Sequence, residues 1–139
     1  MRFGENLTFT ALSFLYPSLD LNYTYHIDHL YARSLFKANR MKKFGINDKS
    51  IIQEYKNRMH KIGNLCILRS HLNIEKSDTE LPFWLESTFT DPHKRTSFIE
   101  ENFIPDMDLS FKEFLTFIDE RNKKLKSHFD TILYDFKKK

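Results

Sequence analysis

The residues best suited to chemistry are His26-Ile27-Asp28-His29, followed much later by Asn64, Asn73 and Lys76. A carboxylate such as Asp28 suits Mg²⁺, which keeps several waters and is usually held by one or two protein carboxylates and substrate phosphate. The neutral imidazole of His29, with an ordinary pKa of about 6.5, can take a proton from water at physiological pH. Asn73 offers an amide oxygen as a second metal ligand. Lys76, one turn later on the same helix face, offers an ammonium for a phosphate.

Two short apolar runs predict the elements that position these residues. Residues 23–27 (YTYHI) are β-branched and aromatic, and residues 65–68 (LCIL) are apolar, so each predicts a strand. Ser70 can cap a short helix that passes through Asn73 to about residue 78. Neighbours on a strand point to opposite faces, but at a strand end Asp28 and His29 can reach the same cleft from its two sides.

Helical patterns predict the remainder of the chain. An amphipathic helix is expected over 5–16, one over about 48–61 capped by Asn47 or Asp48 and stopped by Gly63, and others over 82–89, 93–104 and 109–136. Residues 30–45 read as a basic loop. The predicted fold class is α+β, mostly helical, with a small core of one short antiparallel hairpin plus a helix, surrounded by helices, in a single domain 1–139.

Composition excludes several classes of protein. The chain is 40% hydrophobic and 15% aromatic, which is enough to form a core, and its 3 Gly and 4 Pro argue against an all-β sandwich or barrel. Its one cysteine, Cys66, excludes an internal disulfide framework and a Cys-rich zinc site, and is expected to be a small buried apolar residue. No uncharged apolar run approaches the roughly 20 residues of a membrane-spanning helix. We therefore expect a soluble cytoplasmic protein that does not associate with membranes.

Charge is unevenly distributed along the sequence. Residues 33–71 contain ten basic residues and two acids, a net charge of +8, whereas the remainder carries −5. Such asymmetry indicates one face that binds a polyanion, since each neutralised phosphate releases counterions. A solvated lysine-rich surface explains the charge alone equally well.

The ordered residues Asp28-His29, Asn64 and Asn73-Ile74-Glu75-Lys76-Ser77 resemble the motif of the HNH, or ββα-metal, nucleases. The similarity is strongest to the C-terminal HNH domain of GmrSD-type modification-dependent restriction enzymes and their phage-defence relatives, and extends to the HNH domain of the CRISPR effector nuclease. In that family an Asp-His pair on the first strand is followed by an Asn before the second strand and by Asn-x-x-Lys-Ser on the helix. The resemblance covers residues 23–85. The family usually has Pro three residues after the base histidine, where this chain has Ala32.

This resemblance implies a metal-dependent endonuclease that nicks DNA, in a restriction or phage-defence system. His29 would be the general base, Asn64 would orient it through its loop or ring, and Asp28 and Asn73 would hold one Mg²⁺ or Mn²⁺. Lys76 would meet a phosphate of the DNA. The long basic segment between His29 and Asn64 would be a DNA-contacting insertion.

Other residues have less specific interpretations. Arg69 is expected to contact phosphate because it ends the second strand near the site. His26 either contacts phosphate or metal, or lines the outer edge of the first strand. The remaining residues are interpreted as packing, surface or incidental side chains: His60, His71, His93, His128, Phe83, Trp84 and Leu85.

Each motif residue also has a structural interpretation, and other functions stay open. His29 alone would be a structural histidine, Asn64 a turn residue, and Asn73 and Lys76 surface side chains. The rival functions are an HNH fold that binds nucleic acid or protein without cutting, and an HNH toxin held by an acidic immunity protein. If the chain belongs to the GmrSD-type group, it is a C-terminal fragment that works with an NTPase or sensor domain. A double-strand break would need a homodimer or two successive binding events by a monomer. RNA is an alternative substrate.

Overall fold

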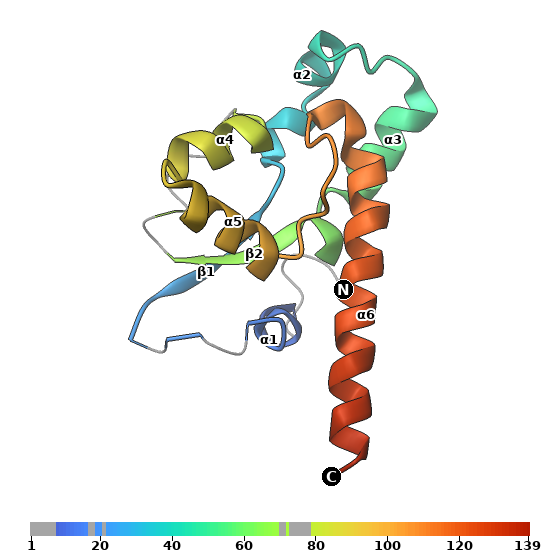
Figure 1. Cartoon of the computed structure of the whole chain (residues 1–139). Helices are drawn as coiled ribbons and strands as arrows, with labels where there is room; N and C mark the ends of the chain where they lie inside the picture. Colours follow the sequence, from blue (N-terminus) through green and yellow to red (C-terminus); the bar gives the residue numbers. More distant parts are fainter. Residues whose placement is uncertain (1–7, 17–18, 21, 70–71, 73–78) are drawn as a thin grey trace.

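A two-stranded antiparallel sheet crosses the fold (Figure 1). The computed structural model describes residues 8–16, 19–20, 22–69, 72 and 79–139. In it, β1 (Tyr25–His29) pairs with β2 (Leu65–Arg69), so that Tyr25 lies opposite Arg69 and His29 opposite Leu65. The predicted hairpin is confirmed, but β1 begins and ends two residues later than expected. Pairing with β2, rather than the β-propensity of residues 23–27, sets where β1 ends.

Helices surround this sheet and confirm the α+β class. They are α1 (Thr8–Ser13), η1 (Arg33–Phe36), α2 (Ala38–Lys43), α3 (Lys49–Arg58), η2 (Ile62–Asn64), α4 (Leu81–Thr88), α5 (Pro92–Glu101), η4 (Phe111–Glu113) and α6 (Phe114–Lys137). The helix predicted after Ser70 lies outside the described residues. None of the helices in the described ranges is long and apolar enough to cross a membrane.

The basic segment after β1 is helical, so its prediction as a loop is wrong. It contains η1 and α2, and Met41 is the only residue of α2 that is buried. A helix with one buried side chain has no apolar periodicity, so the sequence carries no periodic signal for it. Its Ala, Arg, Met and Lys residues are nevertheless strong helix formers.

The turn before β2 lies close to α6. Asp48 caps α3 as predicted, because its Oδ1 accepts the N–H groups of Ser50 at 2.8 Å and Ile51 at 3.2 Å. The helix ends at Arg58, however, so Gly63 is not its cap. Gly63 lies in η2, where an added Cβ would be 2.7 Å from Asn122 Oδ1. A larger residue at this position would have to displace the side chains of Asn122 and Ile118, because η2 packs directly against α6.

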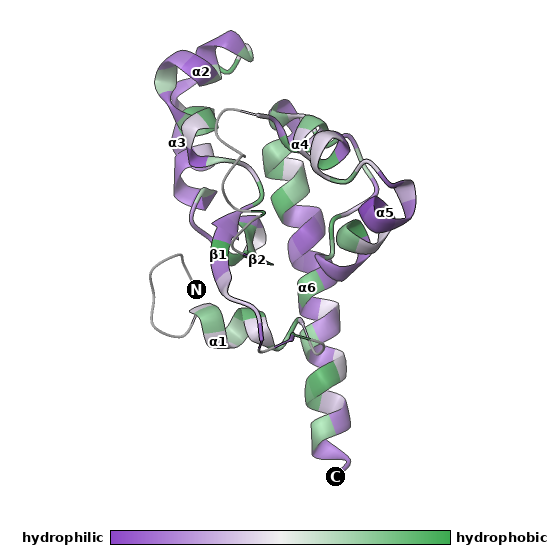
Figure 2. Cartoon of the chain, turned by 90° about the vertical axis from the view of Figure 1, so that its left-hand side faces the viewer, coloured by the Kyte–Doolittle hydropathy of each residue, from purple (hydrophilic) through white to green (hydrophobic). Residues whose placement is uncertain are grey.

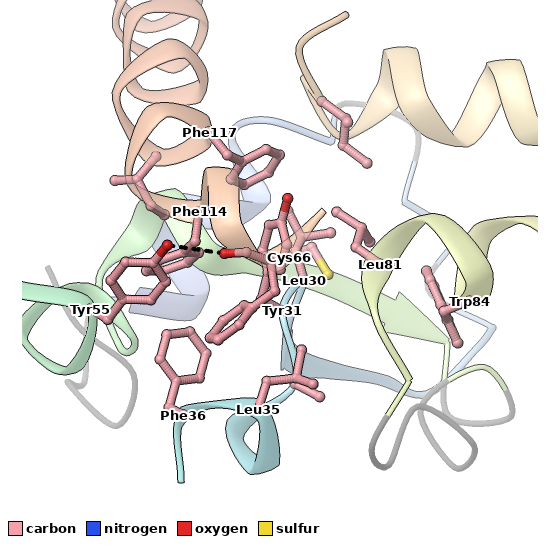
Figure 3. Packing of buried hydrophobic residues seen from close by; sticks show 14 of the residues in the cluster. Leu30, Tyr31, Leu35, Phe36, Tyr55, Cys66, Leu81, Trp84, Phe114 and Phe117 are labelled. Atoms are coloured by element: carbon pink, nitrogen blue, oxygen red, sulfur yellow. Dashed lines mark hydrogen bonds between the residues drawn. The ribbon is translucent and has the colours of Figure 1, made fainter. Parts of the chain in front are cut away.

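The larger apolar cluster includes Cys66 and Leu68 of β2 (Figure 3). Its aromatic centre joins Tyr31 to Phe114 and Phe117, with ring centroids 5.3 and 4.9 Å apart and edge-to-face geometry. The predicted burial of Cys66 is confirmed. Of the three other residues that are expected to pack in the core, Trp84 and Leu85 are buried as predicted, whereas Phe83 is 62% exposed.

A smaller apolar cluster lies on the other face of the sheet, where the side chains of β2 that alternate with Cys66 and Leu68 point. Leu65 and Ile67 of β2 join Leu12 of α1 and Leu125 of α6. The C-terminal part of α6 extends past the rest of the molecule (Figure 1). Leu133 is therefore 55% exposed, although the helical pattern assigns it to the core-facing stripe.

Candidate active site

Asp28 and His29 are the last two residues of β1. Because consecutive strand residues point to opposite faces, Asp28 shares the face of its partner Cys66, and His29 shares the face of Leu65. Asp28 is half-buried, whereas His29 retains only 3% of its surface exposed. The sheet therefore holds a carboxylate and an imidazole at one end of the ribbon, on its two sides.

Asn64 fixes the chain immediately after His29. Its side-chain Oδ1 accepts the N–H of Tyr31 at 2.8 Å, and its Nδ2 donates to the Tyr31 carbonyl at 3.2 Å. The Leu30 N–H also donates to the Asn64 carbonyl at 2.8 Å. Nδ2 donates further to the Met59 carbonyl at 2.9 Å. Asn64 thus contacts the loop after His29, which is one of the two contacts that the resemblance implies for this asparagine.

A buried arginine holds the turn that carries Asn64. The Arg121 guanidinium on α6 is fully buried and donates through Nη1 to the carbonyls of Ile62 at 3.1 Å and Gly63 at 2.8 Å. Its Nε donates to the Asn102 carbonyl at 3.0 Å. Burial lowers the pKa of Arg121, and the electrostatic influence of Tyr16 opposes that effect. No helical pattern points to this residue, because an arginine on an amphipathic helix reads as part of its solvated face.

His60 is the residue of the site that the sequence does not reveal. Its Nδ1 lies 2.9 Å from His29 Nε2, and the two rings meet edge to face with centroids 5.1 Å apart. The sequence alone indicates a surface or packing residue at this position. The only available signal is its place in the turn leading to Asn64, since no spacing rule pairs it with His29.

Arg69 lies farther from His29 than predicted. Antiparallel pairing places it opposite Tyr25, at the other end of the ribbon, about 13 Å along the strand from the level of His29. The expectation that Arg69 is near the site because it ends the second strand is therefore wrong. Its guanidinium lies 3.9 Å from the ring centroid of Tyr23, and its side chain is exposed. His26 is also exposed and shares the face of Asp28.

Other predicted site residues are not described by the structure. Asn73, Lys76 and His71 lie outside the described ranges. Within those ranges, no group of three or more His, Cys, Asp or Glu side chains converges as a metal site. Of the proposed metal ligands, Asp28 alone is therefore described.

Ala32, where the family usually has proline, has a proline-like backbone. Its φ is −57° and its ψ is 140°, and proline imposes a φ of about −65°. The turn after His29 thus keeps the conformation that proline would favour.

Basic residues are concentrated on and around η1, α2 and α3, and Figure 2 shows hydrophilic residues along much of α2 and α3. Most are exposed; the exposed ones are Arg33, Lys37, Lys42, Lys43, Lys49, Lys56, Lys61 and Arg69. Arg58 is instead paired with Glu54 at 2.6 Å and Asp119 at 2.7 Å. The excess positive charge is thus displayed on the surface.

No protein-family model and no curated protein sequence matches this chain. The site must therefore be interpreted from its own geometry. It consists of the half-buried Asp28 carboxylate on one face of the ribbon, the buried His29 imidazole on the other face in contact with the partly buried His60, and an asparagine that fixes the loop after His29.

Proposed function

We propose that the chain is an HNH-type, metal-dependent endonuclease domain that hydrolyses phosphodiester bonds in DNA. In this proposal His29 is the general base, Asp28 and Asn73 are the metal ligands, and Asn64 holds the loop after the base. A monomer has one such site and cuts one strand per visit.

The observation that supports this proposal best is the anchoring of Asn64. An asparagine that merely occupied a turn would not need to be fully buried with both side-chain groups bonded to the main chain after Asp28-His29. These bonds fix the chain that follows Asp28-His29 against the turn before β2. General-base catalysis needs this kind of fixed geometry.

The proposed metal is Mg²⁺ or Mn²⁺, with Asp28 as its ligand from the described part of the chain. Asp28 supplies a partly exposed carboxylate, and Mg²⁺ commonly binds one or two protein carboxylates together with phosphate oxygens and water. When bound, the metal would stabilise charge on the leaving 3′ oxygen. Asp28 and Asn73 would hold it, and exposed lysines such as Lys61 would attract the DNA backbone.

The experiment is supercoiled-plasmid nicking with Mg²⁺ or Mn²⁺, with EDTA, and with an Asp28→Asn variant. We expect open-circle DNA to accumulate before linear DNA, and to disappear with EDTA or the variant. Asp20→Asn is a matched control, since Asp20 is an acid in the turn before β1. Direct conversion to linear DNA would contradict single-strand nicking, and metal-independent cutting would contradict the proposed chemistry.

The burial of His29 favours a second candidate, an HNH-type fold that binds DNA without cutting it. At 3% exposure and with Nε2 bonded to His60, His29 has the surroundings of a structural histidine. This candidate predicts that the protein shifts DNA on a gel, equally with metal or EDTA, and never nicks it.

A further inference from the structure

The contact between His29 and His60 joins two segments that are 31 residues apart in sequence. The distance of 2.9 Å between His29 Nε2 and His60 Nδ1 is that of a hydrogen bond. Two rings packed only for their apolar surface would not need to bring nitrogens together. Burial of His29 makes this hydrogen bond stronger than it would be in water.

This hydrogen bond restricts how protons are arranged on the two rings. A neutral imidazole has one N–H and one acceptor nitrogen. Either His29 Nε2 donates to His60 Nδ1, or His60 Nδ1 donates to His29 Nε2. A general base needs an acceptor nitrogen, so the proposed role of His29 requires the first arrangement, in which His29 Nε2–H donates to His60 Nδ1 and His29 Nδ1 is the acceptor nitrogen. The His29 ring cannot rotate without breaking this bond.

The segment that carries His60 is itself held in place. The carbonyl of the preceding residue, Met59, accepts from Asn64 Nδ2 at 2.9 Å, and the carbonyls of Ile62 and Gly63 accept from Arg121. His60 is therefore presented from a fixed turn rather than a freely moving loop. A group that must orient another side chain needs such support.

We propose that His60 is the positioning residue for His29, fixing its ring orientation and its tautomer; the inference rests on the proposed function of His29 as general base. This role is the third member of a constellation in which a base is oriented by a neighbouring group. His60 would act through His29 and would not touch the substrate.

The test uses variants that differ in where they place a polar atom. His60→Asn keeps an amide atom near the position of Nδ1, His60→Gln moves the amide outward, and His60→Ala removes it. His93→Ala is the matched control, because His93 is an exposed histidine on α5. Dispersed amide NMR spectra establish that each variant is folded.

The first readout is independent of nuclease activity. Proton–nitrogen correlation spectra at about pH 8.5, where histidines with ordinary pKa values are neutral, report the tautomer of each ring. A His29→Gln variant assigns the signals. We expect one tautomer of His29 in the unmodified protein and in His60→Asn, and a mixture in His60→Ala and His60→Gln.

The second readout is the rate of nicking. We expect kcat to fall by about 10- to 100-fold in His60→Ala with KM changed little, and to recover in His60→Asn but not in His60→Gln. Unchanged His29 signals and unchanged kcat in His60→Ala would overturn the inference while leaving the proposed function intact. An unmodified protein that never nicks DNA would overturn the proposed function and this inference together, even if the tautomer shift were seen.

Discussion

At the scale of single residues, the Asn64 side chain makes the hydrogen bonds that a neighbouring strand would make at the point where β1 ends. Its amide bonds to both main-chain groups of Tyr31 as a neighbouring strand would, and thereby extends the ladder beyond His29. Asparagine is suited to this position because its side chain carries both a hydrogen-bond donor and an acceptor, which aspartate and leucine of similar size do not. A carboxylate would lack the donor, and leucine would lack both.

Replacing Asn64 should therefore be costly. We expect Asn64→Ala to lower the free energy of unfolding by about 2–4 kcal/mol, because the N–H and C=O of Tyr31 and the C=O of Met59 lose their partner. Urea unfolding measures this loss. Asn57→Ala, at an exposed position of α3, should change stability by less than about 0.5 kcal/mol. Equal effects of the two substitutions would contradict the anchoring role.

At the scale of elements, α6 holds the turn before β2 through Arg121. The guanidinium donates to the main-chain carbonyls of Ile62, Gly63 and Asn102. It therefore links the C-terminal helix to the turn that carries His60 and Asn64.

Arg121→Met should loosen this link. We expect stability to fall by about 2–4 kcal/mol, because the carbonyls of Ile62, Gly63 and Asn102 are left without this donor. Hydrogen exchange should quicken first at the amide of Asn64. Lys124→Met, at an exposed position of the same helix, is the control. Unchanged exchange at Asn64 in Arg121→Met would argue against the link.

The junction of α3 with η4 should be sensitive to alkaline pH. The Tyr55 hydroxyl donates to the carbonyls of Phe111 at 3.1 Å and Lys112 at 2.7 Å, and burial, with a smaller contribution from Glu113, raises its pKa to about 12. A raised pKa means that the folded state prefers the neutral phenol. Its contribution is complete below the ordinary pKa of about 10 and is lost as pH rises through about 12.

Tyr55→Phe tests this dependence. At neutral pH we expect a loss of about 1 kcal/mol from the missing hydrogen bonds. Between about pH 10 and 12, the variant should lose less stability than the unmodified protein, as measured by urea unfolding at each pH. Tyr134→Phe, at a residue that is 59% exposed, should follow the unmodified protein. Parallel pH curves for Tyr55→Phe and the unmodified protein would exclude this role.

At the scale of the whole molecule, positive charge lies on the helices between the two strands. The pair Lys42→Glu and Lys43→Glu on α2 should weaken DNA binding and reduce the slope of log affinity against log salt by about 0.9 for each phosphate that is no longer neutralised. Fluorescence anisotropy across salt concentrations measures both quantities. The same reversal at Lys123 and Lys124 of α6 preserves the net-charge change and should have a smaller effect. Equal effects would indicate a general charge effect rather than a surface for DNA.

Much of this fold could be predicted, because its signals are local. Asp48 before an apolar-faced segment predicts the start of α3, and the apolar run at 65–68 predicts β2. The end of β1 could not be placed, since it depends on pairing with a strand 36 residues away. The interactions of His60 and Arg121 could not be predicted either, because each depends on a tertiary approach that leaves no periodic pattern.

The same distinction applies to the candidate site. The types and order of Asp28, His29 and Asn64 indicate a possible centre, and the structure supplies the hydrogen bonds that hold it. The displacement of Arg69 to the other end of the ribbon follows from strand direction. Sequence order alone does not convey it.

The most direct measurement is metal-dependent nicking of supercoiled plasmid by the unmodified protein and by His29→Ala, with His93→Ala as a matched histidine control. We expect the rate to fall by about 10²- to 10⁴-fold in His29→Ala, because the general base is removed, and to stay unchanged in His93→Ala. Circular dichroism and urea unfolding ensure that folded proteins are compared. Nicking that survives at the original rate in folded His29→Ala would contradict the role of His29 as the base.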